Sequence, residues 1–93
     1  MTYYSVSVDA AGVATDDGAS AIVAALADRG GVVSTDGRTT RARFTIEAPT
    51  AQAAIADGIE VAGAAWRAAR VRPRIVAAEI VTHAELDRRL ART

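Results

Sequence analysis

The feature that most constrains the fold is a tight turn at Asp36-Gly37 between two segments of β-strand character. Residues 32–35 precede the dipeptide, and residues 38–47, in which apolar and polar side chains alternate, follow it. Asp-Gly between such segments is the strongest short-range signal for a two-residue β-hairpin. The alternation gives the second strand one face for a core and one for solvent.

A strand and a helix are predicted before this hairpin. Residues 2–8 alternate in polarity, which is typical of a half-buried strand. Residues 18–29 carry apolar side chains at helical spacing, with Thr, Asp and Asp at 15–17 as candidate N-caps. Gly30-Gly31 is expected to end this helix, because glycine accepts the left-handed conformation that follows many helices.

A longer helix is predicted after the hairpin. Pro49 stops the preceding strand, and Thr50 can cap a helix over 51–70. Its apolar stripe at helical spacing is expected to be Ile55, Ile59, Ala62, Trp66 and Ala69.

The chain continues with a fourth strand and a short helix. Residues 74–81 have strand character. Thr82 and Glu85 have the spacing of a capping box, in which each side chain bonds a backbone donor near the other, and they predict a helix over 83–91.

The resulting order, βαββαβ, predicts an α+β fold with few solutions. Right-handed crossovers and two helices on one sheet face give a ferredoxin-like two-layer sandwich. We expect an antiparallel sheet of order 4-1-3-2 and one domain over 1–93, with its core in 2–81 and an extra helix over 83–91. The expected large core residues are Tyr4, Val6, Val8, Ile22, Leu26, Phe44, Ile46, Ile55, Ile59, Trp66 and Ile80.

The alternation also predicts which strand residues face the helices. The inward set is expected to be Tyr4, Val6, Val8, Ala42, Phe44, Ile46, Val76, Ala78 and Ile80. The open face is expected to carry Tyr3, Ser5, Ser7, Arg41, Arg43, Thr45, Ile75, Ala77, Glu79 and Val81. That face is polar at its centre and partly apolar along the fourth strand.

Composition excludes several classes of protein. The chain has no cysteine, which excludes disulfides, zinc–thiolate sites and thiol catalysis. No apolar run approaches the roughly 18 residues of a membrane span. The N-terminal segment lacks the pattern of a signal peptide, so a cytoplasmic location is expected.

No motif in the sequence specifies a reaction or a cofactor. His83 is the single histidine, stands at the start of a predicted helix and has no nucleophile at a useful spacing. Asp16-Asp17 reads as a helix cap, and no G-x-S-x-G nucleophile elbow is present. We therefore expect no catalytic, metal-binding or cofactor-binding residues and no enzymatic activity.

All eleven basic residues are arginine, and two groups of them are candidate anion contacts. One group lies where the second long helix ends: Arg67, Arg70, Arg72 and Arg74. The same charges also stabilise a helix C-terminus, so both interpretations stay open. The second group, Arg41 and Arg43, lies on the open face without the aromatic residues with which RNA-binding sheets stack bases.

The segment 75–90, IVAAEIVTHAELDRRL, is similar to the end of the ferredoxin-like N-terminal domain of small actinobacterial and actinophage helix-turn-helix regulators. The element order also resembles ACT-type regulatory domains. These resemblances imply a dimerisation or sensing module of a regulatory protein. Because the sequence reaches Thr93 without a helix-turn-helix, no sequence-specific nucleic-acid binding is expected of it.

The leading functional hypothesis is a non-enzymatic protein-interaction module that forms a homodimer or binds another protein. An alanine-rich core with few large side chains favours association, because pairing hides further apolar surface. A small-ligand-binding ACT-like domain is the first alternative, and a small dimeric ferredoxin-like enzyme is the second. The candidate interface residues are Ile75, Val81, Leu86 and Leu90.

Overall fold

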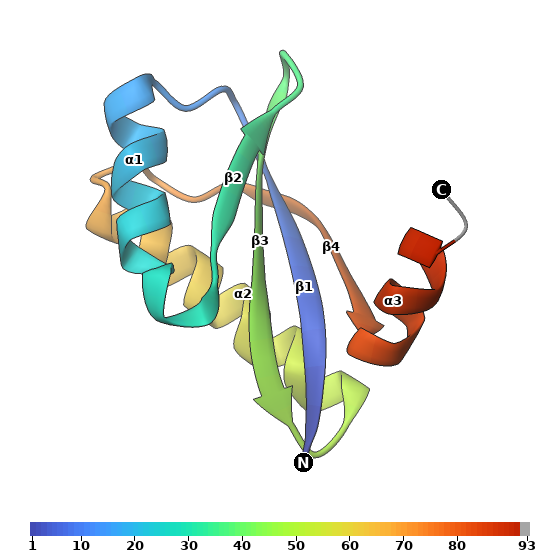
Figure 1. Ribbon diagram of the computed structural model, residues 1–93. Helices are drawn as coiled ribbons and strands as arrows, with labels where there is room; N and C mark the ends of the chain where they lie inside the picture. Colours follow the sequence, from blue (N-terminus) through green and yellow to red (C-terminus); the bar gives the residue numbers. More distant parts are fainter. Residues whose placement is uncertain (92–93) are drawn as a thin grey trace.

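The computed structural model describes residues 1–91, so the last two residues of the predicted domain lie outside it. Four antiparallel strands form one sheet in the order β2-β3-β1-β4 (Figure 1). The elements are β1 Thr2–Ala11, α1 Asp16–Ala25, a 3₁₀ turn Ala27–Arg29, β2 Val32–Thr35, β3 Thr39–Ala48, α2 Ala51–Ala68, β4 Ile75–Thr82 and α3 His83–Ala91. The predicted ferredoxin-like sandwich with an extra C-terminal helix is confirmed.

Helices α1 and α2 cover one face of the sheet (Figure 1), and α3 lies against the other. The His83 ring stacks on Tyr3 of β1, with ring centroids 5.9 Å apart. Further along α3, Arg89 reaches Glu79 of β4 at 3.4 Å. Ser5, on the same face, is only 6% exposed. The short helix therefore docks on its own domain and covers one end of the face that was expected to be open.

The first helix follows its local signals closely. Thr15 is the N-cap, and its hydroxyl oxygen accepts a hydrogen bond of 3.1 Å from the backbone N–H of Gly18. The helix begins at Asp16, two residues earlier than predicted, and its last predicted turn is 3₁₀ in character. Gly30 ends it in the left-handed conformation, as predicted.

The hairpin turn lies one residue further along than predicted. Thr35 pairs with Thr40, and the backbone N–H of Asp36 donates to the carbonyl of Thr39 at 3.2 Å. The two central residues are therefore Gly37 and Arg38. Asp36 precedes them and stabilises the turn through its side chain. Its carboxylate accepts backbone N–H bonds from Arg38 at 3.0 Å and Thr39 at 2.8 Å.

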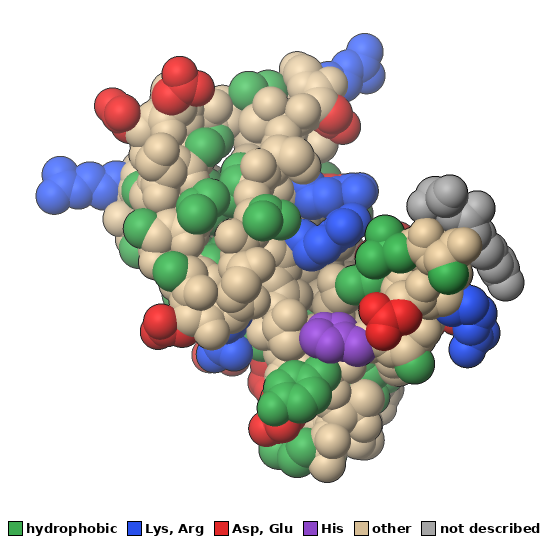
Figure 2. All heavy atoms as spheres, in the orientation of Figure 1, with side chains coloured by type: hydrophobic (Ala, Val, Ile, Leu, Met, Phe, Trp, Pro, Cys, Tyr) green, Lys and Arg blue, Asp and Glu red, His purple; other side chains and the backbone are tan. Residues whose placement is uncertain are grey.

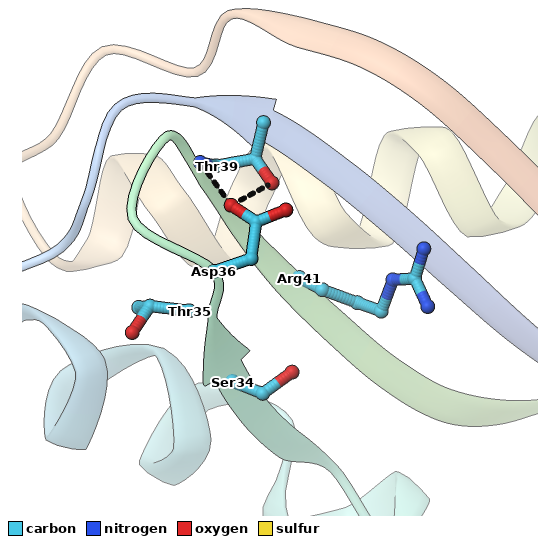
Figure 3. Close-up of a pocket in the computed structure, with 5 residues that line it drawn as sticks. All are labelled: Ser34, Thr35, Asp36, Thr39 and Arg41. Carbon is cyan, nitrogen blue, oxygen red and sulfur yellow. Dashed lines mark hydrogen bonds between the residues drawn. The ribbon is translucent and has the colours of Figure 1, made fainter.

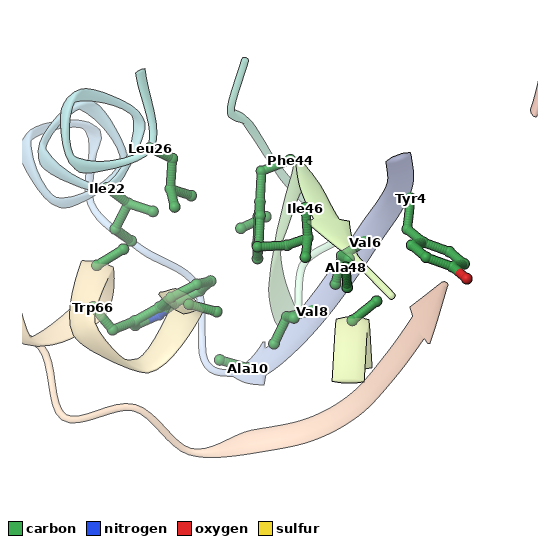
Figure 4. Packing of buried hydrophobic residues seen from close by; sticks show 14 residues of the cluster. Tyr4, Val6, Val8, Ala10, Ile22, Leu26, Phe44, Ile46, Ala48 and Trp66 are labelled. Atoms are coloured by element: carbon green, nitrogen blue, oxygen red, sulfur yellow. The ribbon is translucent and has the colours of Figure 1, made fainter. Parts of the chain in front are cut away.

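The core lies between the sheet and the two long helices (Figure 4). Most predicted members are buried there: Tyr4, Val6, Val8, Ile22, Leu26, Phe44, Ile46 and Trp66. Ile80 and Ala78 are half-buried and pack against this cluster. Ala10 extends the core, because β1 continues three residues beyond its predicted end at residue 8.

The buried face of α2 differs from the predicted stripe. The helix turns small residues toward the sheet, and Ile59 is 38% exposed while Ile55 is half-buried. A β-carbon on Gly58 would lie 2.6 Å from a methyl group of Val6, so the helix approaches β1 too closely for a larger residue. The prediction of Ile55 and Ile59 as core residues was wrong, because this close approach fixes the rotation of the helix. The buried residues are Ala54, Gly58, Ala62, Gly63, Ala65 and Trp66.

A β-bulge changes the predicted faces of β4. Asp9 pairs with Ala77 and Ala10 with Ile75, which leaves Val76 as the extra residue. Ile75 therefore packs against the core, although it was predicted on the open face, and Val76 is 57% exposed, although it was predicted inward. Beyond the bulge, Ala78 and Ile80 keep their predicted direction.

Two glycines of α2 provide a matched test of the close packing. Glycine to alanine normally stabilises a helix interior by about 1 kcal/mol. We expect Gly58→Ala to destabilise the fold by about 1–3 kcal/mol, because the new methyl group overlaps Val6 in a packed core. Gly63→Ala should be neutral or stabilising, because its methyl group meets only the flexible end of Arg67. Urea unfolding of both variants gives the comparison, and equal stabilities would contradict the packing argument.

Candidate functional site

The exposed part of the open face carries charges that neutralise one another. Arg41 of β3 lies opposite Asp9 of β1 in the sheet, and its guanidinium donates two hydrogen bonds of 2.7 and 3.1 Å to that carboxylate. The hydrogen bond and the charge of Asp9 raise the pKa of Arg41. On the neighbouring strand, Glu79 pairs with Arg89. Arg41 is therefore already paired and is a poor candidate for binding a free anion.

Arg43 is the more available of the two predicted arginines on this face. Its Nε donates a 3.3 Å hydrogen bond to the hydroxyl of Ser7, and it makes no ion pair within residues 1–91. Figure 2 shows that acidic and basic side chains are interspersed on the visible face rather than gathered into one basic field. A single guanidinium in this setting is a weak anion site.

A small hollow of about 170 Å³ lies beside the hairpin turn (Figure 3). Its lining residues are Ser34, Thr35, Asp36, Thr39 and Arg41. The Asp36 carboxylate is engaged by two backbone N–H groups and by the Thr39 hydroxyl at 3.0 Å. These hydrogen bonds lower the pKa of Asp36, and through them its carboxylate stabilises the turn.

Of the predicted interface residues of β4 and α3, some are packed against the domain and one is largely exposed. Val81 and Leu86 are half-buried, whereas Leu90 is 63% exposed. The Thr82 hydroxyl accepts a 3.1 Å bond from the Glu85 backbone N–H, so one half of the predicted capping box forms. The Glu85 carboxylate instead pairs with two arginines of α3, Arg88 and Arg89.

The four arginines around the end of α2 do not form one cluster. Arg67 points back along its helix, toward Gly63. Arg70 is the residue after the C-cap and has a left-handed backbone with φ of 60°. Arg72 and Arg74 line a separate hollow of about 590 Å³.

That hollow was not predicted from the sequence. Its other lining residues are Ala11 and Gly12, which follow the predicted end of the first strand, and Pro73. Gly12 has a positive φ of 93° where the chain leaves β1. A glycine directly after a strand was the one available signal of a backbone bend at this place.

The described part of the chain holds no cluster of metal-ligating side chains, and its single histidine lies against an aromatic ring. His83 stacks on Tyr3, and a hydrogen bond to Glu47 and the charge of that carboxylate raise the pKa of Tyr3. No group of three or more His, Cys, Asp or Glu side chains in residues 1–91 is placed to hold a metal ion. None of the helices within that range is long and apolar enough to cross a membrane.

Comparison of the chain with family models, with curated proteins and with solved structures finds no match.

The hairpin turn gives a pH-dependence that can be measured directly. The hydrogen bonds from Arg38 and Thr39 favour the charged form of Asp36 and hold its pKa below the ordinary value of 3.8. Their stabilising effect is present above pH 3.8 and is lost as the pH falls through the pKa of the folded state. NMR titration of the Asp36 carboxyl should give a midpoint below 3.8, with parallel shifts of the Arg38 and Thr39 amides. Asp36→Asn should abolish those amide shifts, and a midpoint at or above 3.8 would contradict the geometry.

Proposed function

We propose that the chain is a non-enzymatic interaction module of a regulatory protein and that it forms a homodimer by pairing β4 with β4 of a second copy. The observation that supports this proposal is the outer edge of β4. Strand β4 pairs with β1 on one side only, because it is the last strand in the sheet order. Its backbone donors and acceptors on the other side have no strand partner within the described chain, and such an edge is a template for another strand.

The two edges of the sheet are not equivalent. Strand β2 has four residues, and short edge strands resist pairing with other chains. Strand β4 has eight residues, of which Glu79 alone is charged. Glu79 is already engaged by Arg89 of the same chain. The longer and more apolar edge is therefore the one suited to association.

Apolar side chains of α2 flank this edge on the helical side. One flank of α2 faces β3, where Val61 and Ala64 line a hollow together with Ile46. The opposite flank of α2 carries Ile55 and Ile59 and lies toward β4, with which α2 is in contact. Exposed Ile59 and Val76 would lose water contact if a second copy extended the sheet, which gives apolar burial in addition to the backbone hydrogen bonds.

Self-pairing of β4 has one long register that does not place the two Glu79 carboxylates directly opposite each other. A register centred on Glu79 places two carboxylates directly opposite each other, which is destabilising. A register centred on Ile80 pairs only residues 78–82. With Ala78 at the two-fold axis, Glu79 of one copy lies opposite Ala77 of the other, and residues 75–81 of β4 pair. We therefore assign the two-fold axis to Ala78.

The dimer predicts a mass and a way to abolish it. Light scattering after size exclusion at micromolar concentration should give about twice the 9.6 kDa of one chain. Ile59→Lys combined with Val76→Lys should give monomers, because both side chains are exposed and lysine on an edge opposes pairing. Val32→Lys, at an exposed position of the other edge, is the matched control and should remain dimeric. A monomeric parent chain would overturn the proposal.

The register is tested by cross-linking, for which the absence of cysteine is an advantage. Directly opposed residues of an antiparallel pair have Cα atoms about 4.5–5.5 Å apart, within the range of a disulfide. Ala78→Cys should form covalent dimers under mild oxidation, seen on non-reducing gels. Glu79→Cys should form few. More efficient cross-linking of Glu79→Cys than of Ala78→Cys would support the β4 interface but contradict its register. Efficient cross-linking of Val32→Cys would instead place the interface at β2.

A further inference from the structure

One end of the sheet gathers three arginines from separate parts of the chain. The backbone N–H of Ala11 donates to the carbonyl of Arg74 at 2.9 Å, and that of Gly12 donates to the carbonyl of Arg38 at 2.8 Å. These two bonds join the end of β1, the hairpin turn and the segment before β4. The backbones of Arg38 and Arg74 are thereby held on either side of the same two-residue bend.

Between these segments lies the hollow of about 590 Å³ lined by Arg72 and Arg74. No carboxylate lines it. Within residues 1–91, neither arginine forms an ion pair, nor does Arg38, whereas Arg41 does. Two guanidinium groups without a counter-charge on the wall of a concave surface attract anions, since arginine presents its donors as a fork that fits phosphate and carboxylate oxygens.

The backbone that carries the two arginines is also constrained before any ligand arrives. Pro73 lies between them and fixes its own φ, and a residue before proline is confined to extended conformations. The Arg74 carbonyl is tied to β1. Because the backbone on both sides of Pro73 is constrained, binding needs little ordering of the backbone.

A second hollow of about 180 Å³ adjoins the first and shares Ala11 and Gly12 with it. Its wall includes the apolar side chains of Val13, Trp66 and Val71. The two hollows together offer a cationic wall beside an apolar one. A ligand with an anionic group attached to an apolar or aromatic body fits this combination.

We infer that this end of the sheet binds a small phosphorylated molecule, with the phosphate between Arg72 and Arg74 and the rest of the molecule toward Val13 and Val71. A phosphate group matches two guanidinium groups better than a carboxylate does, because it has more charge and more acceptor oxygens. The open face is less suitable, since Asp9 already neutralises Arg41 there. This inference goes beyond the proposed dimer and does not depend on it.

The test uses the full chain, ¹⁵N-labelled, titrated with pyrophosphate at constant ionic strength set by sodium chloride. Saturable shifts are expected for the amides of Ala11, Gly12 and Arg74. Arg72→Gln with Arg74→Gln should weaken binding by about tenfold or more, because both charged hydrogen-bond donors to the phosphate are lost. Arg67→Gln is the control on the same helix end and should bind as the parent does.

Shifts that do not saturate, shifts confined to other residues, or equal loss of binding in the Arg67→Gln control would overturn the inference. Circular dichroism checks the fold of each variant. If the double glutamine variant does not fold, Arg72→Lys with Arg74→Lys replaces it, because lysine keeps the charge and lacks the fork. A single-stranded RNA oligonucleotide that competes far more strongly than pyrophosphate would assign the site to a nucleic acid and reject the small ligand.

Discussion

The close contact between α2 and β1 at Gly58 and Val6 is the constraint on which the rest of the structure depends. The helix lies so near the sheet that a single β-carbon at Gly58 would overlap a valine methyl group. Small residues must therefore form the buried face of α2, and the larger isoleucines turn to its flank. A chain rich in alanine obtains dense packing in this way, and it leaves Ile59 exposed on the flank of α2 that lies toward β4.

The placement of α3 decides which surfaces are left for partners. Sheets of this topology have one face free of helices, yet here the stacking of His83 on Tyr3 and the Arg89–Glu79 pair hold a third helix against part of it. The remaining exposed area contains the Arg41–Asp9 pair and has little unbalanced charge. Association is therefore proposed at the β4 edge, and ligand binding at the end of the sheet near Arg72 and Arg74.

Local signals in the sequence predicted the elements and the fold well. Thr50 caps the helix that it was expected to cap, Thr15 is the one of three N-cap candidates that caps the first helix, and Gly30 ends that helix. Alternation identified the buried faces of β1 and β3. The main errors concern the rotation of α2 and the faces of Ile75 and Val76, because neither is fixed by local sequence. Periodicity alone favours the stripe with the largest side chains, whereas the structure selects the stripe that permits the closest approach.

By itself, the sequence determined the order of elements, because capping, turn formation and alternation act over a few residues. It also determined the sheet topology, because only a few topologies satisfy that order. Its lack of cysteine excluded thiol chemistry. Only the tertiary structure decided which flank of α2 is exposed, where the bulge in β4 lies and which arginines share a hollow. Those properties depend on contacts between residues far apart in the chain, such as the bonds of Ala11 to Arg74 and of Gly12 to Arg38. Such contacts leave no periodic pattern in the sequence, because the residues that meet are close in space but far apart along the chain.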